Sequence, residues 1–305
     1  MRRHVAASAS ADLVVLTIAP PPSGPVTRVV FLGTPELAVP PLRALVTAGI
    51  DVALVVSQPD RRRGRGVALS PSPVKAVALE LGVPVTDQVD DVLDVDAQLG
   101  VVVAFGRIIR PPVLAVLPMV NLHFSLLPRW RGAAPVERAI LAGDEVTGVD
   151  LMAVEEGLDT GGIYARTELK ISPDETLDDL RGRLVEAGTD LLVDALRDGL
   201  GEAAAQSGAP SHAAKIEAED LHLDWTQPAL AVHRRVRLGG AWTTHEGRRL
   251  KVWRTHVPPA GEGPVVAAGD GPVELVEVQP EGKARMSATA WAHGARWQPR
   301  EGLGT

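Results

Sequence analysis

The first two thirds of the chain alternate between two kinds of apolar segment. Continuous apolar runs are typical of buried parallel strands, and apolar residues spaced three and four apart are typical of amphipathic helices. The expected strands cover residues 29–32, 53–56, 101–106 and 120–124, and the expected helices cover 38–49, 72–82 and 177–195. Strands and helices in this alternation predict an α/β domain with a doubly wound parallel sheet.

The last third has a different pattern, in which short strands are separated by glycine turns. Strands are expected at 240–244, 250–253 and 273–278, with a turn at Glu246-Gly247 between the first two. Every tryptophan except Trp130 lies beyond residue 224. This pattern predicts a smaller C-terminal β-barrel domain.

A segment rich in glycine, alanine and serine, 199–210, separates the two patterns and is typical of a linker. A chain of 305 residues with 45% hydrophobic residues can bury one large core and still supply a second, smaller one. We therefore expect an α/β domain over 28–200, a linker over 201–214 and a β domain over 215–305.

The first 27 residues fit neither domain. Arg2 and Arg3 precede a short apolar run, 13–19, in superficial imitation of a signal peptide, but the small residues come before the run and not after it. The run is far shorter than the roughly 20 residues that span a bilayer, so we expect no membrane span. We expect a disordered extension or a mis-assigned start, with translation beginning at Val26. Native protein that begins at Met1 by mass spectrometry would refute the second idea.

The composition restricts the chemistry. The chain has no cysteine, which excludes disulfides, thiolate metal sites and a cysteine nucleophile. A net charge of -7 and a pI near 5.6 argue against nonspecific coating of nucleic acid, although a local basic patch is compatible with them. The histidines have no recognisable ligand spacing, so no metal is expected.

The strongest candidate site is the segment 121–135, which reads NLHFSLLPRWRGAAP. Residues two apart in a strand share a face, so Asn121 and His123 present an amide and an imidazole together. The amide can donate to a developing oxyanion and the imidazole can shuttle a proton, which suits acyl transfer. A lone histidine at a strand end is more often structural, so this interpretation needs a third group.

Asp159 is the candidate for that group. Glycines on both sides of it let a loop fold back and present a carboxylate that fixes the imidazole. From the residues alone, an aspartate that only forms a turn explains the segment equally well. The first strand-to-helix turn, 33–36, holds only one glycine of the dinucleotide fingerprint, so no nicotinamide cofactor is expected.

These motifs resemble the enzymes that use 10-formyltetrahydrofolate as a formyl donor. The Asn-x-His pair, the SLLPxxRGxxP loop and the LDTG loop occur in that superfamily's order and approximate spacing. The resemblance implies a Rossmann-like formyltransferase domain in which Asn121, His123 and Asp159 are the catalytic residues. We expect the folate to lie beyond the strand ends and to contact Phe105, Gly106, Arg107, Ile108, Ser125, Leu126, Leu127, Pro128 and Leu158.

Features outside this core resemble the methionyl-tRNA formyltransferases. An arginine-rich loop over 57–66 is similar to the loop that this family inserts against the tRNA acceptor end, and the C-terminal domain resembles its oligonucleotide-binding (OB) fold. Arginines among glycines make a flexible cationic finger that can contact phosphates and unpaired bases. Arg234, Arg235 and Arg237 add to a locally basic C-terminal region. The resemblance implies initiator methionyl-tRNA as the acceptor, with contacts from Arg61, Arg62, Arg63, Arg65, Lys215, Arg248, Arg249 and Lys251.

Three alternatives remain open. A formyltransferase for a sugar-nucleotide amine would share the core without needing the arginine finger. A folate-dependent hydrolase would release formate without an acceptor. A noncatalytic RNA-binding protein would explain the basic region and leave Asn121, His123 and Asp159 without a purpose. We expect a cytoplasmic monomer.

Overall fold

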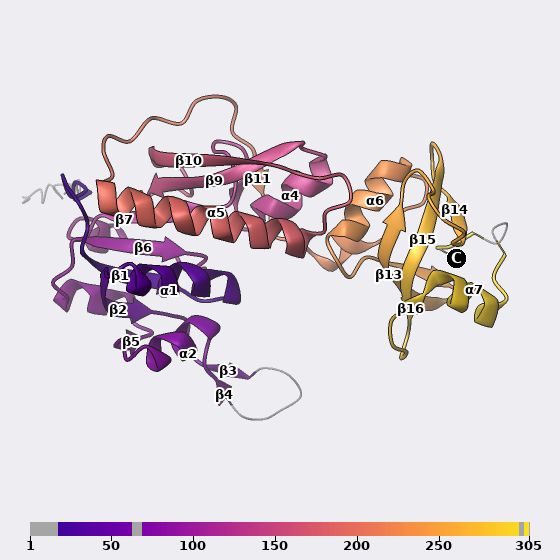
Figure 1. Ribbon diagram of the computed structural model, residues 1–305, viewed down its shortest axis with the longest axis horizontal. Helices are drawn as coiled ribbons and strands as arrows, with labels where there is room; N and C mark the ends of the chain where they lie inside the picture. Colours follow the sequence, from indigo (N-terminus) through magenta and orange to yellow (C-terminus); the bar gives the residue numbers. More distant parts are fainter. Residues whose placement is uncertain (1–17, 63–68, 299–301, 305) are drawn as a thin grey trace, which may run out of the picture.

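The computed structural model describes residues 18–62, 69–298 and 302–304, and it forms two lobes that lie end to end (Figure 1). Each lobe has its own apolar core. The N-terminal lobe contains β1 (Arg28–Gly33), η1 (Glu36–Ala38), α1 (Val39–Thr47), β2 (Asp51–Val56), β3 (Arg61–Arg62), β4 (Leu69–Ser70), α2 (Pro73–Glu80), β5 (Val85–Thr86), η2 (Val89–Asp94), β6 (Leu99–Val103), α3 (Pro111–Leu114), β7 (Met119–His123), β8 (Arg131–Gly132), α4 (Pro135–Ala142), β9 (Val146–Ala153), β10 (Ile163–Lys170), α5 (Leu177–Asp198) and β11 (His212–Ala213). The C-terminal lobe contains η3 (Ala218–Leu221), α6 (Ala229–Arg237), β12 (Trp242–His245), β13 (Arg248–His256), β14 (Val265–Ala267), β15 (Pro272–Pro280), β16 (Met286–Ser287) and α7 (Ala288–Ala295).

The large sheet of the N-terminal lobe has the strand order β10-β9-β7-β6-β1-β2-β5. All neighbouring strands from β7 to β5 pair in parallel. Strand β9 is antiparallel to β7, and β10 is antiparallel to β9. The chain starts at β1, moves outward to β2 and β5, and then returns to the other side of β1 with β6. The predicted α/β doubly wound fold is therefore confirmed, and its topological switch point lies between β1 and β6, where such sheets commonly bind ligands.

Side chains cap the starts of helices α2 and α5. The Ser72 hydroxyl accepts a hydrogen bond from the Lys75 amide at the start of α2. Thr176 and Asp179 form a reciprocal capping box at the start of α5. The apolar face of α5 includes Leu180 and Leu184, both fully buried, and packs against α1, β9 and β10.

The expected extension and the expected linker both include residues that lie against the N-terminal lobe. Residues 1–17 are outside the described part, but the Val26 amide donates to the Leu196 carbonyl and the Val26 side chain is buried in the core. In the linker, Ala204 forms an antiparallel bridge with Ile163, and β11 pairs with β8. These segments therefore follow the surface of the domain and contribute hydrogen bonds to it.

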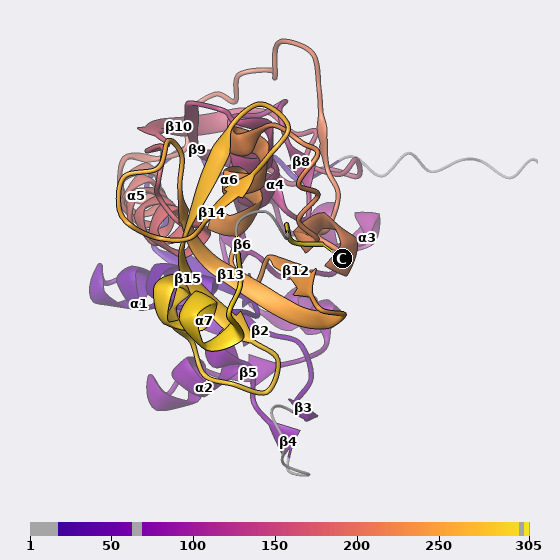
Figure 2. The ribbon, with the colours of Figure 1, turned by 90° about the vertical axis from the view of Figure 1, so that its right-hand side faces the viewer.

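The C-terminal lobe is an antiparallel sheet with the order β12-β13-β15-β14, and β16 pairs with β15. The three expected strands are confirmed as β12, β13 and β15. Two register shifts in the β13–β15 pairing give the sheet the local bend and twist that bulges produce (Figure 2). Within the described residues the pairings run along an open path from β12 to β14. Helices α6 and α7, which pack on this sheet, were not predicted from the sequence.

The junction between the lobes uses charged residues of α6. The Arg237 guanidinium donates to the backbone carbonyls of Ser172 and Glu175, and His233 Nε2 lies 3.1 Å from Asp174 Oδ1. The Arg235 guanidinium donates to the Asp220 carbonyl. Arg235 and Arg237 were expected in a basic surface, but the structure places both in backbone contacts near the junction. No helix of the described chain is long and apolar enough to cross a membrane.

Candidate active site

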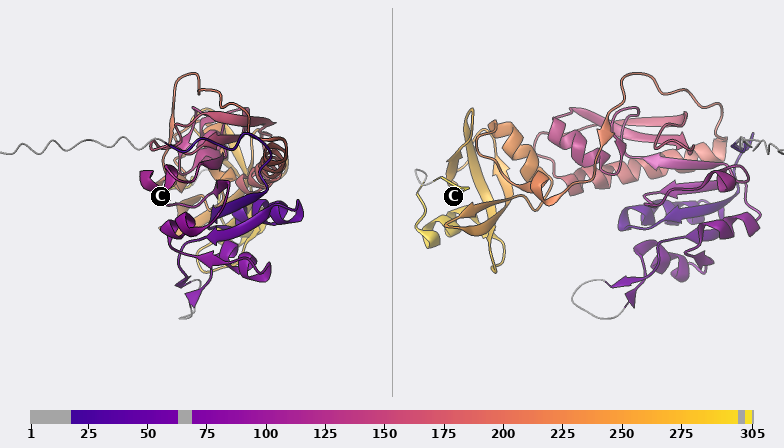
Figure 3. Two further views of the ribbon diagram at one scale, coloured as in Figure 1. Left: turned by 90° about the vertical axis from the view of Figure 1, so that its left-hand side faces the viewer. Right: turned by 180° about the vertical axis from the view of Figure 1, so that it is seen from behind.

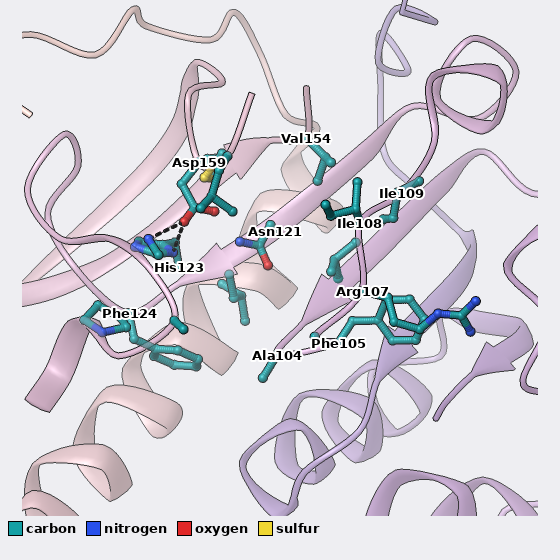
Figure 4. A pocket seen from close by; sticks show the side chains of 18 of the residues that line it. Ala104, Phe105, Arg107, Ile108, Ile109, Asn121, His123, Phe124, Val154 and Asp159 are labelled. Atoms are coloured by element: carbon teal, nitrogen blue, oxygen red, sulfur yellow. Dashed lines mark hydrogen bonds and ion pairs between the residues drawn. The ribbon is translucent and has the colours of Figure 1, made fainter. Parts of the chain in front are cut away.

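Strand β7 presents Asn121 and His123 to one cavity (Figure 4). Residues on the opposite face of the strand, Val120 and Leu122, are buried in the core that α1 and α5 cover. The alternation of a β-strand therefore separates the two polar side chains from the apolar ones. The side-chain amide of Asn121 makes no hydrogen bond with the rest of the described chain. Its N–H donors and its oxygen acceptor are therefore free for a ligand.

Both ring nitrogens of His123 face protein atoms. Nε2 lies 2.9 Å from the Trp130 carbonyl oxygen, and because a carbonyl only accepts, this nitrogen carries a hydrogen. Nδ1 lies 3.6 Å from Asp159 Oδ2, which is an ion-pair distance longer than a hydrogen bond. A second hydrogen on the ring would point at that carboxylate. The imidazole is thus held between a backbone carbonyl and a carboxylate, and its side chain is buried.

Asp159 reaches His123 from the loop between β9 and β10. Its backbone adopts a left-handed conformation with φ of 52°, and its Oδ2 accepts the Gly132 amide at 2.8 Å. A Cβ on Gly161 would lie 2.0 Å from the Ala153 carbonyl oxygen, so the loop can fold this closely only with glycine there. The two loops thus meet at His123.

The cavity has a volume of about 600 Å³, within the range of ligand pockets, and lies at the carboxyl end of β6 and β7. Five of the expected folate contacts line it: Phe105, Gly106, Arg107, Ile108 and Leu158. Ile108 is 86% exposed and Leu158 is 61% exposed, which leaves apolar area at the mouth for a ligand to cover. The Phe105 carbonyl accepts from Thr34 and Gln58, which ties this loop to the two neighbouring strand ends.

The other four expected folate contacts, Ser125 to Pro128, do not line this cavity. The Ser125 hydroxyl is buried and donates to the Arg129 carbonyl. The Leu127 amide donates to Asp150, and its carbonyl accepts from Arg166. This loop therefore packs inward and supports the Trp130 and Gly132 backbone groups near His123.

The side chains that hold these loops in place were not predicted from the sequence. Asp150 is fully buried, and its hydrogen bonds to the Arg166 guanidinium raise the pKa of Arg166. Gln206, in the expected linker, donates to the Asp159 and Gly161 carbonyls and accepts from Arg131. The sequence feature that could have indicated this role is that Gln206 has a long amide side chain in a segment of mainly small residues.

The expected tRNA contacts lie in three separate places. Arg61 and Arg62 are exposed on the β3–β4 hairpin, which projects below α2 (Figure 2), and Arg63 and Arg65 lie outside the described residues. Lys215 is exposed just before η3.

The remaining three residues that we expected to contact tRNA lie on β13. Arg248 and Arg249 are exposed, and the Arg249 guanidinium stacks 4.0 Å above the Trp242 ring. The Lys251 ammonium lies 5.7 Å from the centre of the Trp253 ring. Cations beside partly exposed tryptophans make a surface that can contact both phosphates and bases.

Two family models cover most of the chain. Residues 27–196 match the formyl transferase family, and residues 215–296 match the formyl transferase C-terminal domain. The methionyl-tRNA formyltransferase of Arthrobacter sp. (strain FB24) is 43% identical over 295 residues, covering 88% of this chain and 96% of that protein. That of Jannaschia sp. (strain CCS1) is 43% identical over 296 residues, covering 89% and 98%.

Solved structures share the fold at lower identity. HypX from Aquifex aeolicus in complex with tetrahydrofolic acid has a TM-score of 0.61 and 16% identity, covering 87% of this chain and 46% of that chain. The N-formyltransferase from Helicobacter canadensis in complex with folinic acid and dTDP-3-aminofucose also has a TM-score of 0.61 and 16% identity, covering 82% and 99%. These structures show the fold alone. The two family models and the 43% identical relatives show that the chain belongs to the methionyl-tRNA formyltransferase family.

Proposed function

We propose that this chain transfers the formyl group of 10-formyltetrahydrofolate to the free amino group of initiator methionyl-tRNA, giving N-formylmethionyl-tRNA for translation initiation. The observation that carries the proposal is the convergence of three motif residues, Asn121, His123 and Asp159, on one cavity in a chain 43% identical to methionyl-tRNA formyltransferases. Neither the hydrolase nor the noncatalytic alternative accounts for both parts of this observation.

The folate co-substrate fits the side of the cavity that Phe105 to Ile109 border. The apolar side chains of this loop suit a flat ring, and the formyl group then faces Asn121. The bound folate supplies the activated formyl carbon. The transfer that we propose uses the side chains of the cavity and needs no metal.

In the proposed reaction, Asn121 is the oxyanion donor. A bond forms between the methionyl nitrogen and the formyl carbon, and the bond from that carbon to the folate nitrogen breaks. Negative charge develops on the formyl oxygen between these two events, and the free Asn121 amide is placed to donate to it. His123 is less well placed as a second donor to this oxygen, because its Nε2 hydrogen points to the Trp130 carbonyl. A direct contact would require the ring to give up that bond.

His123 and Asp159 act as a proton-handling pair in this proposal. The attacking amine loses a proton, and the departing folate nitrogen gains one. Asp159 faces Nδ1 of a ring that is already fixed through Nε2, so the carboxylate orients the imidazole. Through a water, this carboxylate can carry the proton from one nitrogen to the other.

The tRNA contacts that we propose extend over both lobes. The arginine-rich loop, of which Arg61 and Arg62 are described, would meet the acceptor end, and Arg248, Arg249 and Lys251 would support the tRNA from the side. We further propose the boundaries 28–200, 201–214 and 215–305 for the catalytic domain, the linker and the tRNA-binding domain, and a cytoplasmic monomer. Complete cores within one chain support a monomer, which sedimentation analysis would test.

The experiment is formyl transfer from 10-formyltetrahydrofolate to initiator tRNA charged with methionine. Charged elongator tRNA and a sugar-nucleotide amine serve as parallel acceptors. We expect selective formylation of the initiator. Transfer to the sugar amine alone would contradict the proposed acceptor and keep the folate site, and formate release without any acceptor would indicate a hydrolase.

A further inference from the structure

The backbone at Trp130 faces both members of the His123–Asp159 pair. The Trp130 carbonyl oxygen lies 2.9 Å from His123 Nε2, and the amide of Gly132 donates to Asp159 Oδ2 at 2.8 Å. A change in the Trp130 backbone would therefore move the two groups that orient the imidazole and the carboxylate. The proposed proton transfer needs both side chains in place, so the contacts that hold Trp130 also bear on the reaction.

The backbone of Trp130 is not in a conformation that tryptophan favours. Its φ is 61°, in the left-handed region, which a bulky side chain disfavours. The Trp130 amide donates to the Ser211 hydroxyl in the linker, which passes over the β9–β10 edge of the sheet on its way to the C-terminal lobe (Figure 3). Strand β11 of this linker pairs with β8, which begins at the next residue. A backbone in this region persists only where its surroundings hold it.

The indole ring of Trp130 makes a further contact, with Asp144. Trp130 Nε1 donates to Asp144 Oδ2 at 2.7 Å, and the same carboxylate accepts hydrogen bonds of 2.6 and 2.9 Å from the Arg129 guanidinium. The Asp144 side chain is 18% exposed, whereas the Arg129 side chain is 54% exposed. The bond to the indole is therefore better shielded from water than the ion pair with Arg129.

Asp144 follows the end of α4, where a carboxylate does not serve the helix. Helix α4 ends at Gly143, and the Asp144 amide donates to the Ala139 carbonyl, which fixes the Asp144 backbone at the helix end. The carboxyl end of a helix is the negative end of its dipole and disfavours a carboxylate. The Asp144 side chain is explained instead by the groups that it binds, the Trp130 indole and the Arg129 guanidinium.

We infer that Trp130 and Asp144 are positioning residues, whose indole–carboxylate bond holds the Trp130 carbonyl against His123 and so fixes the tautomer of the ring. This inference rests on the proposed function. A carbonyl accepts only from a ring nitrogen that carries a hydrogen, so Nε2 carries it and Nδ1 faces Asp159. Without the bond to Asp144, the left-handed backbone relaxes, and the ring loses the acceptor that selects this tautomer.

The test removes this one bond from either side. Trp130→Phe keeps an aromatic ring and deletes Nε1–H, and Asp144→Ala deletes the acceptor. Each should lower kcat for formyl transfer to initiator methionyl-tRNA by about tenfold, because small displacements of a catalytic group are costly. The KM values for folate and tRNA should stay within about twofold. The double variant should be no slower than the slower single variant, since both changes break the same interaction.

Two matched variants separate positioning from a general effect on stability or charge. Asp144→Asn keeps an oxygen that can accept the indole hydrogen but loses the charge, so it should recover most of the rate that Asp144→Ala loses. Arg129→Gln weakens the other contact of Asp144 and leaves the indole bond in place, so it should keep the wild-type kcat.

Nitrogen NMR reads the tautomer of His123 directly. The histidines are isotopically labelled, His123 is assigned by the loss of its signals in His123→Gln, and spectra are recorded above the pH at which these signals stop moving. The wild type should carry its ring hydrogen on Nε2, and Trp130→Phe should show a mixture of both tautomers. Because no substrate is present, this result does not depend on the proposed acceptor.

The inference is overturned if Trp130→Phe keeps the wild-type kcat or the wild-type His123 tautomer, or if Arg129→Gln loses as much rate as Asp144→Ala does. A wild-type protein that formylates no methionyl-tRNA, but whose His123 tautomer still responds to Trp130→Phe, would overturn the proposed function and leave the positioning contact standing.

Discussion

The polar residues of the cavity and the cationic residues of the C-terminal lobe are held in different ways. The Trp130 carbonyl holds the His123 ring, and the Gly132 amide holds the Asp159 carboxylate. Gln206 in turn donates a hydrogen bond to the Asp159 carbonyl and so holds its loop. The arginines of the C-terminal lobe divide instead into two sets, because Arg237 is buried at the junction while Arg249 is exposed on Trp242. A motif with fixed spacing therefore predicts a site. A cluster of charged residues in the sequence predicts a charged surface less well, because some of those residues are buried in the fold.

The largest expected effect comes from Asp159→Asn. The amide oxygen can still accept the Gly132 hydrogen bond, but the charge beside His123 Nδ1 is lost. Single-turnover formyl transfer should slow by roughly 10²–10⁴, the usual range for acid–base assistance. Glu168→Gln, an exposed charge change on β10 outside the cavity, is the control and should transfer at the wild-type rate. If Asp159→Asn and Glu168→Gln transferred the formyl group at similar rates, Asp159 would have no role in the chemical step.

Asn121→Ala should have the next largest effect. Its free amide is the oxyanion donor in the proposed reaction, and loss of one such donor costs roughly 10²–10³ in kcat. The KM values for tRNA and folate should change little, because the donor acts in the transition state. Steady-state kinetics with both substrates separate these quantities, and turnover near the wild-type level would refute the assignment.

Gln206→Ala tests whether the linker supports the site. Removing the two hydrogen bonds to the Asp159 and Gly161 carbonyls should loosen the Asp159 loop and lower kcat by roughly tenfold. Gln206→Glu keeps an acceptor for Arg131 but removes both donors, so it should be impaired as well. Wild-type kcat in Gln206→Glu would show that the loop holds its place without these donors.

Two arginine variants test the division within the C-terminal lobe. Arg249→Ala should raise the KM for tRNA by about fivefold with little change in kcat, since cationic and stacking contacts add modest affinity. Arg237→Ala should instead lower the free energy of unfolding, by about 1–3 kcal/mol, because it removes the hydrogen bonds that the buried guanidinium donates to the Ser172 and Glu175 carbonyls. A raised KM for tRNA in Arg237→Ala, with a lowered free energy of unfolding in Arg249→Ala, would mean that Arg237 and not Arg249 contacts the tRNA.

The smallest effect concerns pH at the junction. Burial lowers the pKa of His233, although the Pro173 carbonyl and Asp174 oppose this. The folded state therefore binds the proton more weakly than the unfolded state does, so stability is complete above the usual histidine pKa and declines as the pH falls below it. Urea unfolding at pH 7.5 and 5.5 should show this decline, and His233→Gln should reduce it.

Strands β1, β2, β6 and β7, the long helix α5 and the Asn121–His123 pair were predictable because they depend on local periodicity. Strands β9 and β10, at the antiparallel edge of the same sheet, were not predicted. Asp159 was predictable only through the family motif, since a turn explained its glycines equally well. The place of the Ser125–Pro128 loop was not predictable, because the buried Asp150–Arg166 pair that draws it inward comes from two other strands. Contacts between distant segments, such as Arg237 with Ser172, likewise leave no pattern in either segment alone.

The most direct test is a crystal structure of the protein with folinic acid, a formylated folate, bound in the cavity. The account predicts the ring system along Phe105 to Ile109 and the formyl group on the side of Asn121. A folate whose ring system lies away from Phe105 to Ile109, or whose formyl group lies away from Asn121, would contradict it.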